Sequence, residues 1–127
     1  MKVSHFGGTQ HCDTLEKLDF VLNSRFGDGV NEFWISGETE TPCLTMLVNN
    51  SYASLTYFPD DEHPGYQSVG KDCDLDLCEI TVFFTNSPQE ELEINNDAVI
   101  PLSLAITAAK EFFVNFKIPS CVEWSEM

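Results

Sequence analysis

Basic residues are scarce in this sequence. Six of the 127 residues are lysine or arginine, against 21 aspartates and glutamates, so the formal net charge at pH 7 is −15. Proteins that bind nucleic acid directly replace condensed counterions with lysine and arginine, and proteins that adsorb to anionic lipid also rely on these side chains. The composition therefore argues against nucleic acid or a membrane surface as a direct partner.

Long apolar runs are also missing, and none approaches the length of a membrane span. The first residues, "MKVSHFGGTQHCD", contain one lysine but no apolar segment, so we expect no signal peptide. The number of cysteines is odd and their spacing shows no disulfide framework. They are Cys12, Cys43, Cys73, Cys78 and Cys121. We therefore expect a reduced cytoplasmic protein.

Catalytic motifs are absent as well. The sequence contains no GxSxG, HExxH, P-loop or GxGxxG pattern. A cysteine nucleophile needs cationic surroundings to form thiolate, and the acidic composition raises the thiol pKa instead. The interpretation is a protein that is not an enzyme, with no catalytic residues and no cofactor.

Apolar residues make up 43% of the chain, with ten phenylalanines, three tyrosines and two tryptophans. That aromatic content is typical of a folded protein and not of a disordered acidic tail. The length fits one domain, residues 1–127. The acids are unevenly placed, since residues 60–127 hold fourteen of them against three lysines.

Two helices are predicted from apolar spacing. The first, "DTLEKLDFVLNSRFGDG" at 13–29, has Asp13 as its expected cap with Glu16 in a capping box, and its apolar stripe runs to Phe26. The second, "PLSLAITAAKEFFVNF" at 101–116, has Pro101 at its expected first position and an apolar stripe that ends at Phe116.

Between and after these helices the pattern favours strands. The runs 43–48 and 52–58 read as a hairpin around Asn49-Asn50-Ser51, because asparagine tolerates left-handed turn conformations. Further strands are expected near 31–38, 65–70, 78–85 and 92–100, with an edge strand in 121–127. The predicted class is α+β: a mainly antiparallel sheet with the N-terminal helix and the longer C-terminal helix packed on one face, and a short C-terminal strand.

The segment "YFPDDEHPGYQSVGKDCDLDLCE" at 57–79 holds seven acids, a histidine and two cysteines. A zinc site usually needs tight local pairs, and neither Cys-x4-Cys nor the adjacent His11-Cys12 is specific. "DCDLDLCE" has three acids of a calcium loop but Leu77 where glycine should stand. We therefore expect no metal site, although an acidic protein-binding adaptor module, with or without a dependence on calcium, stays open as an alternative.

Aromatic residues beside these acids could anchor a protein interface. Tyr57 and Tyr66 look exposed, whereas Trp34 and Trp124 are expected to pack internally. Cys78 is expected to be half buried before its strand. The alternative for Tyr66 is that it merely holds its own loop in place.

Two stretches, "YFPDDEHPGYQSVG" and "AVIPLSLAITAAKEFFVNFKIPSCVEW", together resemble the Imm1 family of bacterial immunity proteins. The resemblance covers most of residues 30–124 and depends on the order and spacing of the set. "NFKIP" departs from the family, which often has a glycine-containing turn there. The matched residues are Tyr57, Phe58, Pro64, Gly65, Pro101, Ala108, Phe112, Pro119 and Trp124.

The resemblance implies an α+β inhibitor encoded beside a secreted toxin effector in a polymorphic toxin or contact-dependent inhibition system. The expected partner is a basic toxin domain that acts on nucleic acid, such as a deaminase or nuclease, and is neutralised in the cytoplasm. The number of copies in the assembly is left open. We expect the toxin-binding residues to be Tyr57, Asp60, Asp61, Glu62, His63, Tyr66, Asp72, Asp74 and Asp76.

Overall fold

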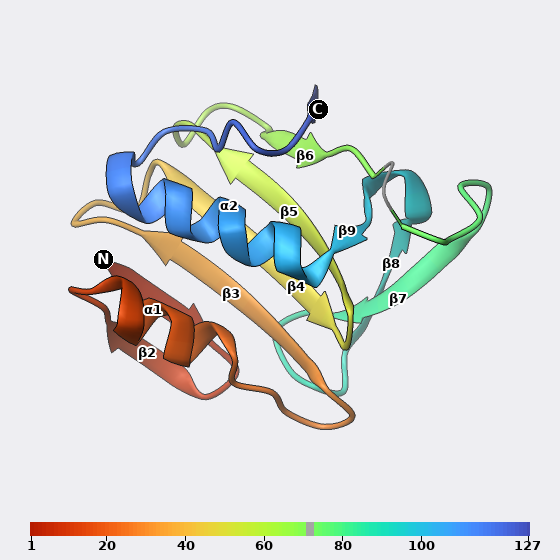
Figure 1. Ribbon diagram of the computed structural model, residues 1–127, viewed down its shortest axis with the longest axis horizontal. Helices are drawn as coiled ribbons and strands as arrows, with labels where there is room; N and C mark the ends of the chain where they lie inside the picture. Colours follow the sequence, from red (N-terminus) through yellow and green to blue (C-terminus); the bar gives the residue numbers. More distant parts are fainter. Residues whose placement is uncertain (71–72) are drawn as a thin grey trace.

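The computed structural model describes residues 1–70 and 73–127 (Figure 1). The first half of the chain forms β1 (Lys2–His5), β2 (Gly8–His11), α1 (Leu15–Leu22), β3 (Val30–Ser36), β4 (Cys43–Asn49) and β5 (Tyr52–Phe58). The second half forms β6 (Tyr66–Ser68), β7 (Ile80–Phe84), β8 (Glu91–Asn95), the 3-10 helix η1 (Asn96–Ala98), β9 (Ile100–Pro101), α2 (Leu102–Asn115) and β10 (Trp124–Glu126). The predicted α+β class, with the longer helix near the C-terminus, is confirmed.

The described residues form an eight-stranded antiparallel sheet in the order β10-β6-β5-β4-β3-β1-β2, with β9 beside β5. The β4–β5 hairpin is confirmed, and Asn50 in its turn has a φ of 54°. The terminal strand β10 is an edge strand, as expected. The N-terminal hairpin β1–β2 was not predicted, because β2 is exposed throughout and shows no apolar alternation.

The helices begin and end at different residues from those expected. Thr14, not Asp13, caps α1, and its side chain accepts a hydrogen bond from the Lys17 amide. Asp13 instead forms an ion pair with Lys17 across one helical turn. Phe26 lies beyond the end of α1, in a bridge with Val30. Pro101 caps α2, and Phe116 ends that helix in the left-handed conformation.

Both helices lie on the same face of the sheet, as Figure 1 shows, with α2 across β4 and β5 and α1 beside it. The core between the two layers is built by one set of alternating strand residues, among them Phe33, Ile35, Leu44 and Met46. The three small side chains of α2 in this core let the helix approach the strands closely. They are Ala105, Ala108 and Ala109.

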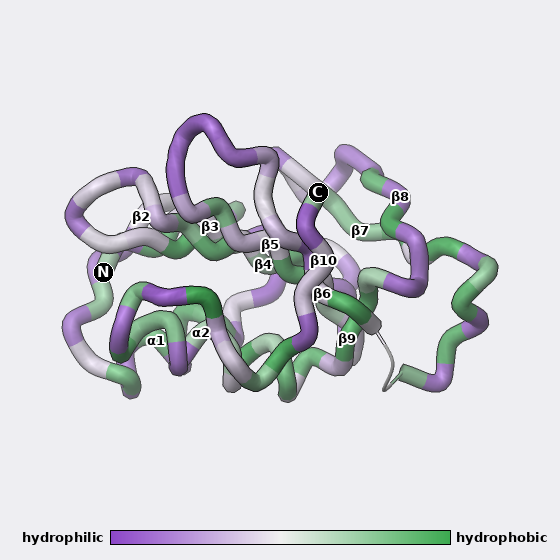
Figure 2. The backbone as a smooth tube through the Cα atoms, turned by 90° about the horizontal axis from the view of Figure 1, so that it is seen from above, coloured by the Kyte–Doolittle hydropathy of each residue, from purple (hydrophilic) through white to green (hydrophobic). Residues whose placement is uncertain are grey.

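The opposite face of the sheet is only partly covered. The two-stranded sheet β7–β8 packs over one half, where Phe83 is fully buried with Leu47 and Val99. Figure 2 shows hydrophilic backbone segments on this side of the sheet, away from α1 and α2. Neither described α-helix combines the length and apolar content needed to cross a bilayer.

Candidate functional site

The residues predicted to bind a partner fall into three environments, and Tyr57 belongs to the core. Its side chain is 8% exposed, so the expectation that it is exposed is wrong. Tyr57 pairs with Leu44 on the helix-facing side of the sheet and meets Phe112 edge to face at a centroid distance of 6.1 Å. Burial raises the pKa of the Tyr57 hydroxyl. The residue positions β5 against α2 and offers little surface to a partner.

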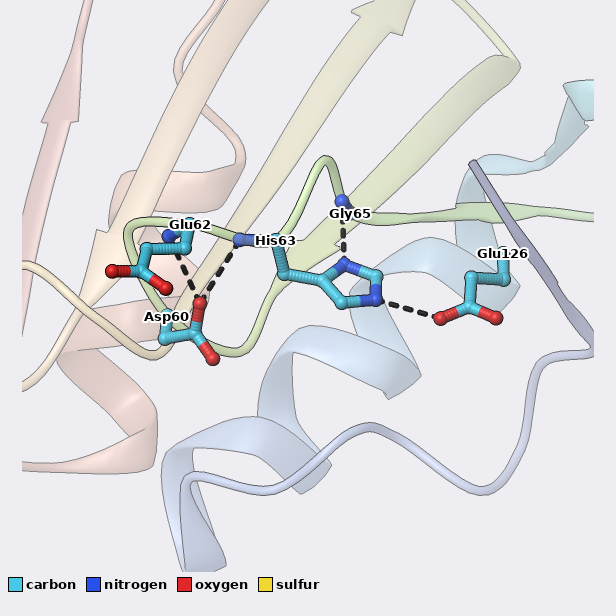
Figure 3. Close-up of polar contacts among 5 residues, drawn as sticks. All are labelled: Asp60, Glu62, His63, Gly65 and Glu126. Carbon is cyan, nitrogen blue, oxygen red and sulfur yellow. Dashed lines mark hydrogen bonds and ion pairs between the residues drawn. The ribbon is translucent and has the colours of Figure 1, made fainter.

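The Asp60–Gly65 loop is held by polar contacts of its own (Figure 3). Asp60 Oδ1 accepts hydrogen bonds from the backbone amides of Glu62 and His63, each at 2.9 Å. His63 Nδ1 accepts from the Gly65 amide at 2.8 Å, which leaves Nε2 to carry the proton toward Glu126 Oε2, also at 2.8 Å. These bonds connect the loop to β10 at the sheet edge and leave Asp61 and Glu62 exposed.

Tyr66 contributes to the same arrangement. Its ring stacks on the His63 imidazole at a centroid distance of 4.7 Å, with the ring planes 14° apart. Tyr66 is half-buried and also packs against the core. Its visible role is therefore to hold the loop, although its partly exposed ring can still touch a partner.

Asp74 and Asp76 lie elsewhere on the molecule. Asp74 Oδ1 accepts from the Tyr52 hydroxyl at 2.9 Å, at the start of β5, whereas Asp60 follows the end of the same strand. Since a strand rises about 3.3 Å per residue, the two acidic segments are roughly 20 Å apart. Figure 1 shows them on opposite sides of β6. Asp72 lies outside the described residues.

Asp76 has a local structural role. Its Oδ1 accepts from the Cys78 amide at 2.9 Å, and its backbone carbonyl accepts from Asn96 Nδ2 at 2.8 Å. Cys78 is exposed, so the expectation of a half-buried side chain is wrong. Within residues 1–70 and 73–127, no three histidine, cysteine, aspartate or glutamate side chains are grouped to hold a metal ion.

The half of the sheet face that β7–β8 leaves uncovered contains a hollow of about 500 Å³. Its floor carries Trp34 of β3 and Phe58 of β5, whose rings are within 3° of parallel at a centroid distance of 6.3 Å. Trp34 is 46% exposed, so the expectation that it packs internally is wrong. Three predicted residues line the same hollow: Asp60, Asp61 and His63.

The described lining of the hollow is more acidic than basic, and its one cysteine is not an activated nucleophile. Glu40 joins the two aspartates at its wall, and among the described lining residues Lys2 is the one lysine or arginine. Burial raises the pKa of the Cys43 thiol to about 11, with Glu40 adding to the rise and Lys2 opposing it. Cys43 is therefore a neutral thiol at pH 7, and the hollow is suited to binding a positive group.

Trp34 and Glu40 were missed as candidate site residues. The signal for Trp34 was present, because side chains alternate along a strand and Trp34 shares its face with Glu32 and Ser36. Phe33 and Ile35 occupy the core side. A large aromatic residue among polar neighbours on one face of a strand indicates contact with something outside the core.

Comparison with known proteins found a similarity along the full length of the chain, whereas no family model matches the chain. The chain is 26% identical over 128 residues to the double-stranded DNA deaminase immunity protein of Burkholderia cenocepacia (strain H111). The match covers all of both chains. The resemblance to bacterial immunity proteins indicated by the sequence is thereby confirmed.

Proposed function

We propose that this chain is an immunity protein that binds a double-stranded DNA deaminase toxin domain and neutralises it by stoichiometric occlusion. The observation that carries the proposal is the similarity along the whole chain to an immunity protein of that kind. The chain acts in the cytoplasm of the toxin-producing cell and its siblings, as an inhibitor with no chemistry of its own.

The charge distribution supports this partner. A domain that acts on DNA presents lysine and arginine to the phosphate backbone. The present chain has a net charge of −15 and presents exposed carboxylates at both ends of β5. Complementary fields raise association rates by orders of magnitude, which matters because unbound toxin damages the cell.

The geometry supports occlusion by a surface. A deaminase must draw its target base out of the duplex into a pocket, and a protein seated on the DNA-binding surface blocks that access. Of the predicted contact residues, we propose Asp60, Asp61, Glu62, His63 and Tyr66 for the interface. Asp72, Asp74 and Asp76 remain a proposed second acidic segment, and we propose that it contributes less to binding than the first.

The test is inhibition of the deaminase domain encoded beside the gene for this chain. Purified deaminase is incubated with double-stranded DNA, and deamination of the DNA bases is measured as the present chain is added. We expect activity to reach zero at a 1:1 ratio and an equimolar complex in size-exclusion chromatography. Full deaminase activity in the presence of excess chain would contradict the proposal. An unrelated protein of similar size and net charge serves as the control for non-specific electrostatic binding.

A further inference from the structure

The hollow on the open half of the sheet has the chemistry of a receptor for one kind of side chain. Trp34 is the single exposed residue of β3, and its neighbours in that strand are buried. Exposed tryptophan at the centre of a sheet leaves a large apolar area in water that an interface would remove. The parallel ring of Phe58 extends this aromatic floor across β4 to β5.

The lining of the hollow also includes three carboxylates, those of Glu40, Asp60 and Asp61. Both hydrogen bonds to Asp60 use Oδ1, so the loop fixes the direction of this carboxylate while Oδ2 has no partner among the described residues. Asp61 is exposed and makes no hydrogen bond or ion pair within the part of the chain that the structure describes. Glu40 approaches from the β3–β4 connection.

An aromatic floor with carboxylates at its edge matches a guanidinium group better than an ammonium group. Guanidinium is planar and weakly hydrated, so it stacks on a tryptophan face while its edge donates to carboxylate oxygens. Lysine offers a strongly hydrated point charge and cannot do both. A guanidinium-bearing chain also fits the space, since its apolar stem can lie against Phe58.

We propose that the hollow formed by Trp34, Phe58, Glu40, Asp60 and Asp61 receives an arginine side chain of the partner. For the identity of that partner the inference rests on the proposed function: the arginine is one that the deaminase domain otherwise uses to contact DNA phosphates. Filling the hollow withdraws that arginine from DNA, so the acidic inhibitor competes with the substrate for the same side chain.

The first test measures the dissociation constant of the complex by calorimetry. We expect Trp34→Ala to weaken binding roughly 30-fold or more, in the range of an interface hot spot. The matched control is Phe20→Ala, which removes an aromatic residue that is 77% exposed on the helix side, and we expect it to change affinity by less than about 3-fold. Equal effects of the two variants would overturn the inference.

The second test separates local from overall charge. Asp60→Asn/Asp61→Asn keeps the Oδ1 acceptor of the loop but removes two negative charges, and Glu91→Gln/Glu93→Gln removes two from exposed positions on β8. We expect the aspartate pair to weaken the complex about ten times more than the glutamate pair. Equal weakening would mean that only net charge matters and would overturn the inference.

The third test requires no toxin. The indole N–H resonance of Trp34 is followed by NMR while Nα-acetylarginine amide or Nα-acetyllysine amide is added. Both probes keep a charged side chain, and the Trp124 indole serves as an internal reference. Trp124 Nε1 donates to the Pro119 carbonyl at 2.8 Å, so its signal reports general changes. We expect Trp34 to shift with the arginine probe at concentrations where lysine has no effect, and equal responses would overturn the inference.

These tests distinguish the two proposals. If the wild-type chain does not inhibit the deaminase, the proposed function is refuted. The arginine titration still decides the chemistry of the hollow in that case. Full inhibition by Trp34→Ala at unchanged affinity would leave the proposed function standing and refute the role of the hollow.

Discussion

One face of the sheet points away from the helices. Its two halves are built from the same strands, but one half is covered and the other is accessible. On the half beneath β7–β8, Leu47, Phe83 and Val99 form a buried hydrophobic cluster. On the other half, Trp34 and Phe58 lie parallel and accessible at the floor of a hollow. The comparison teaches that this sheet stabilises the fold with one half and leaves aromatic side chains of the other half accessible.

A buried carboxylate also holds β7–β8 against the covered half of the sheet. Glu32 of β3 is 8% exposed and accepts hydrogen bonds from Thr85 Oγ1 at 2.6 Å and from the Asn86 amide at 3.0 Å. Asn49 donates to the Val82 carbonyl at 2.8 Å and joins β4 to β7. Polar groups buried in this way are costly to unpair, so they specify where the hairpin docks.

The largest expected effect on stability comes from removing a buried side chain from the covered half. Phe83→Ala should lower the free energy of unfolding by about 3–5 kcal/mol, because a fully buried phenylalanine leaves a cavity. Trp34→Ala on the open half should lower it by less than about 1 kcal/mol, since half of that side chain is already in water. Urea denaturation followed by circular dichroism measures both. Similar losses for the two variants would break the distinction between the halves.

The next effect concerns the hydrogen bonds that the buried Glu32 carboxylate accepts from the β7–β8 turn. Glu32→Ala should cost about 2–3 kcal/mol of unfolding free energy, because two donors on the β7–β8 turn lose a charged acceptor. Glu32→Gln should cost less, since its carbonyl oxygen can still accept one of the bonds. Glu40→Gln on the open half serves as the control and should change stability by no more than about 0.5 kcal/mol. Thermal unfolding by calorimetry provides the measurement.

A smaller effect is expected on the association rate, and it differs between the acids at the two ends of β5. If the open half faces the toxin, Asp60→Asn/Asp61→Asn should slow association roughly 3- to 10-fold and flatten its dependence on salt. Asp74→Asn/Asp76→Asn removes the same charge beside the covered half and should slow association by no more than about 2-fold. Stopped-flow mixing with the deaminase domain at several salt concentrations measures both rates. A larger effect for the second pair would move the interface to that end.

The smallest effect is local to the covered half. The hydrogen bond to Asp74, with its negative charge, raises the pKa of the Tyr52 hydroxyl above its ordinary value. Asp74→Asn should therefore lower that pKa, because the phenolate no longer forms beside a carboxylate. Ultraviolet absorbance during an alkaline titration, with Tyr52→Phe subtracted, measures the shift. Asp76→Asn should leave it unchanged.

Much of the fold could be predicted because its signals are local. The β4–β5 hairpin follows from alternation and a turn at Asn50, and α2 follows from an apolar stripe after Pro101. The capping residue of α1 could not be separated from its neighbour, because Asp13 and Thr14 are both good caps. The β1–β2 hairpin was missed because its pairing with β3, and not its own composition, stabilises it.

The candidate site was predicted only in part. Asp60, Asp61 and His63 do meet at one hollow, whereas Tyr57 belongs to the core and Asp74 lies near the other end of β5. A strand side chain points to either face, and local sequence does not tell which face another layer covers. The polar neighbours Glu32 and Ser36 indicate the face on which Trp34 lies, but only the extent of β7–β8 over the sheet shows that Trp34 stays exposed there.

The sequence by itself determined the charge, the order of helices and strands, and the resemblance to immunity proteins, because each depends on composition or on residues near one another in the chain. Only the tertiary structure decided which half of the sheet stays open, and hence which acids share a hollow with Trp34 and Phe58. The physical reason is that β7 and β8 bury an apolar patch limited to one half, and that limit is set by contacts between residues far apart in sequence.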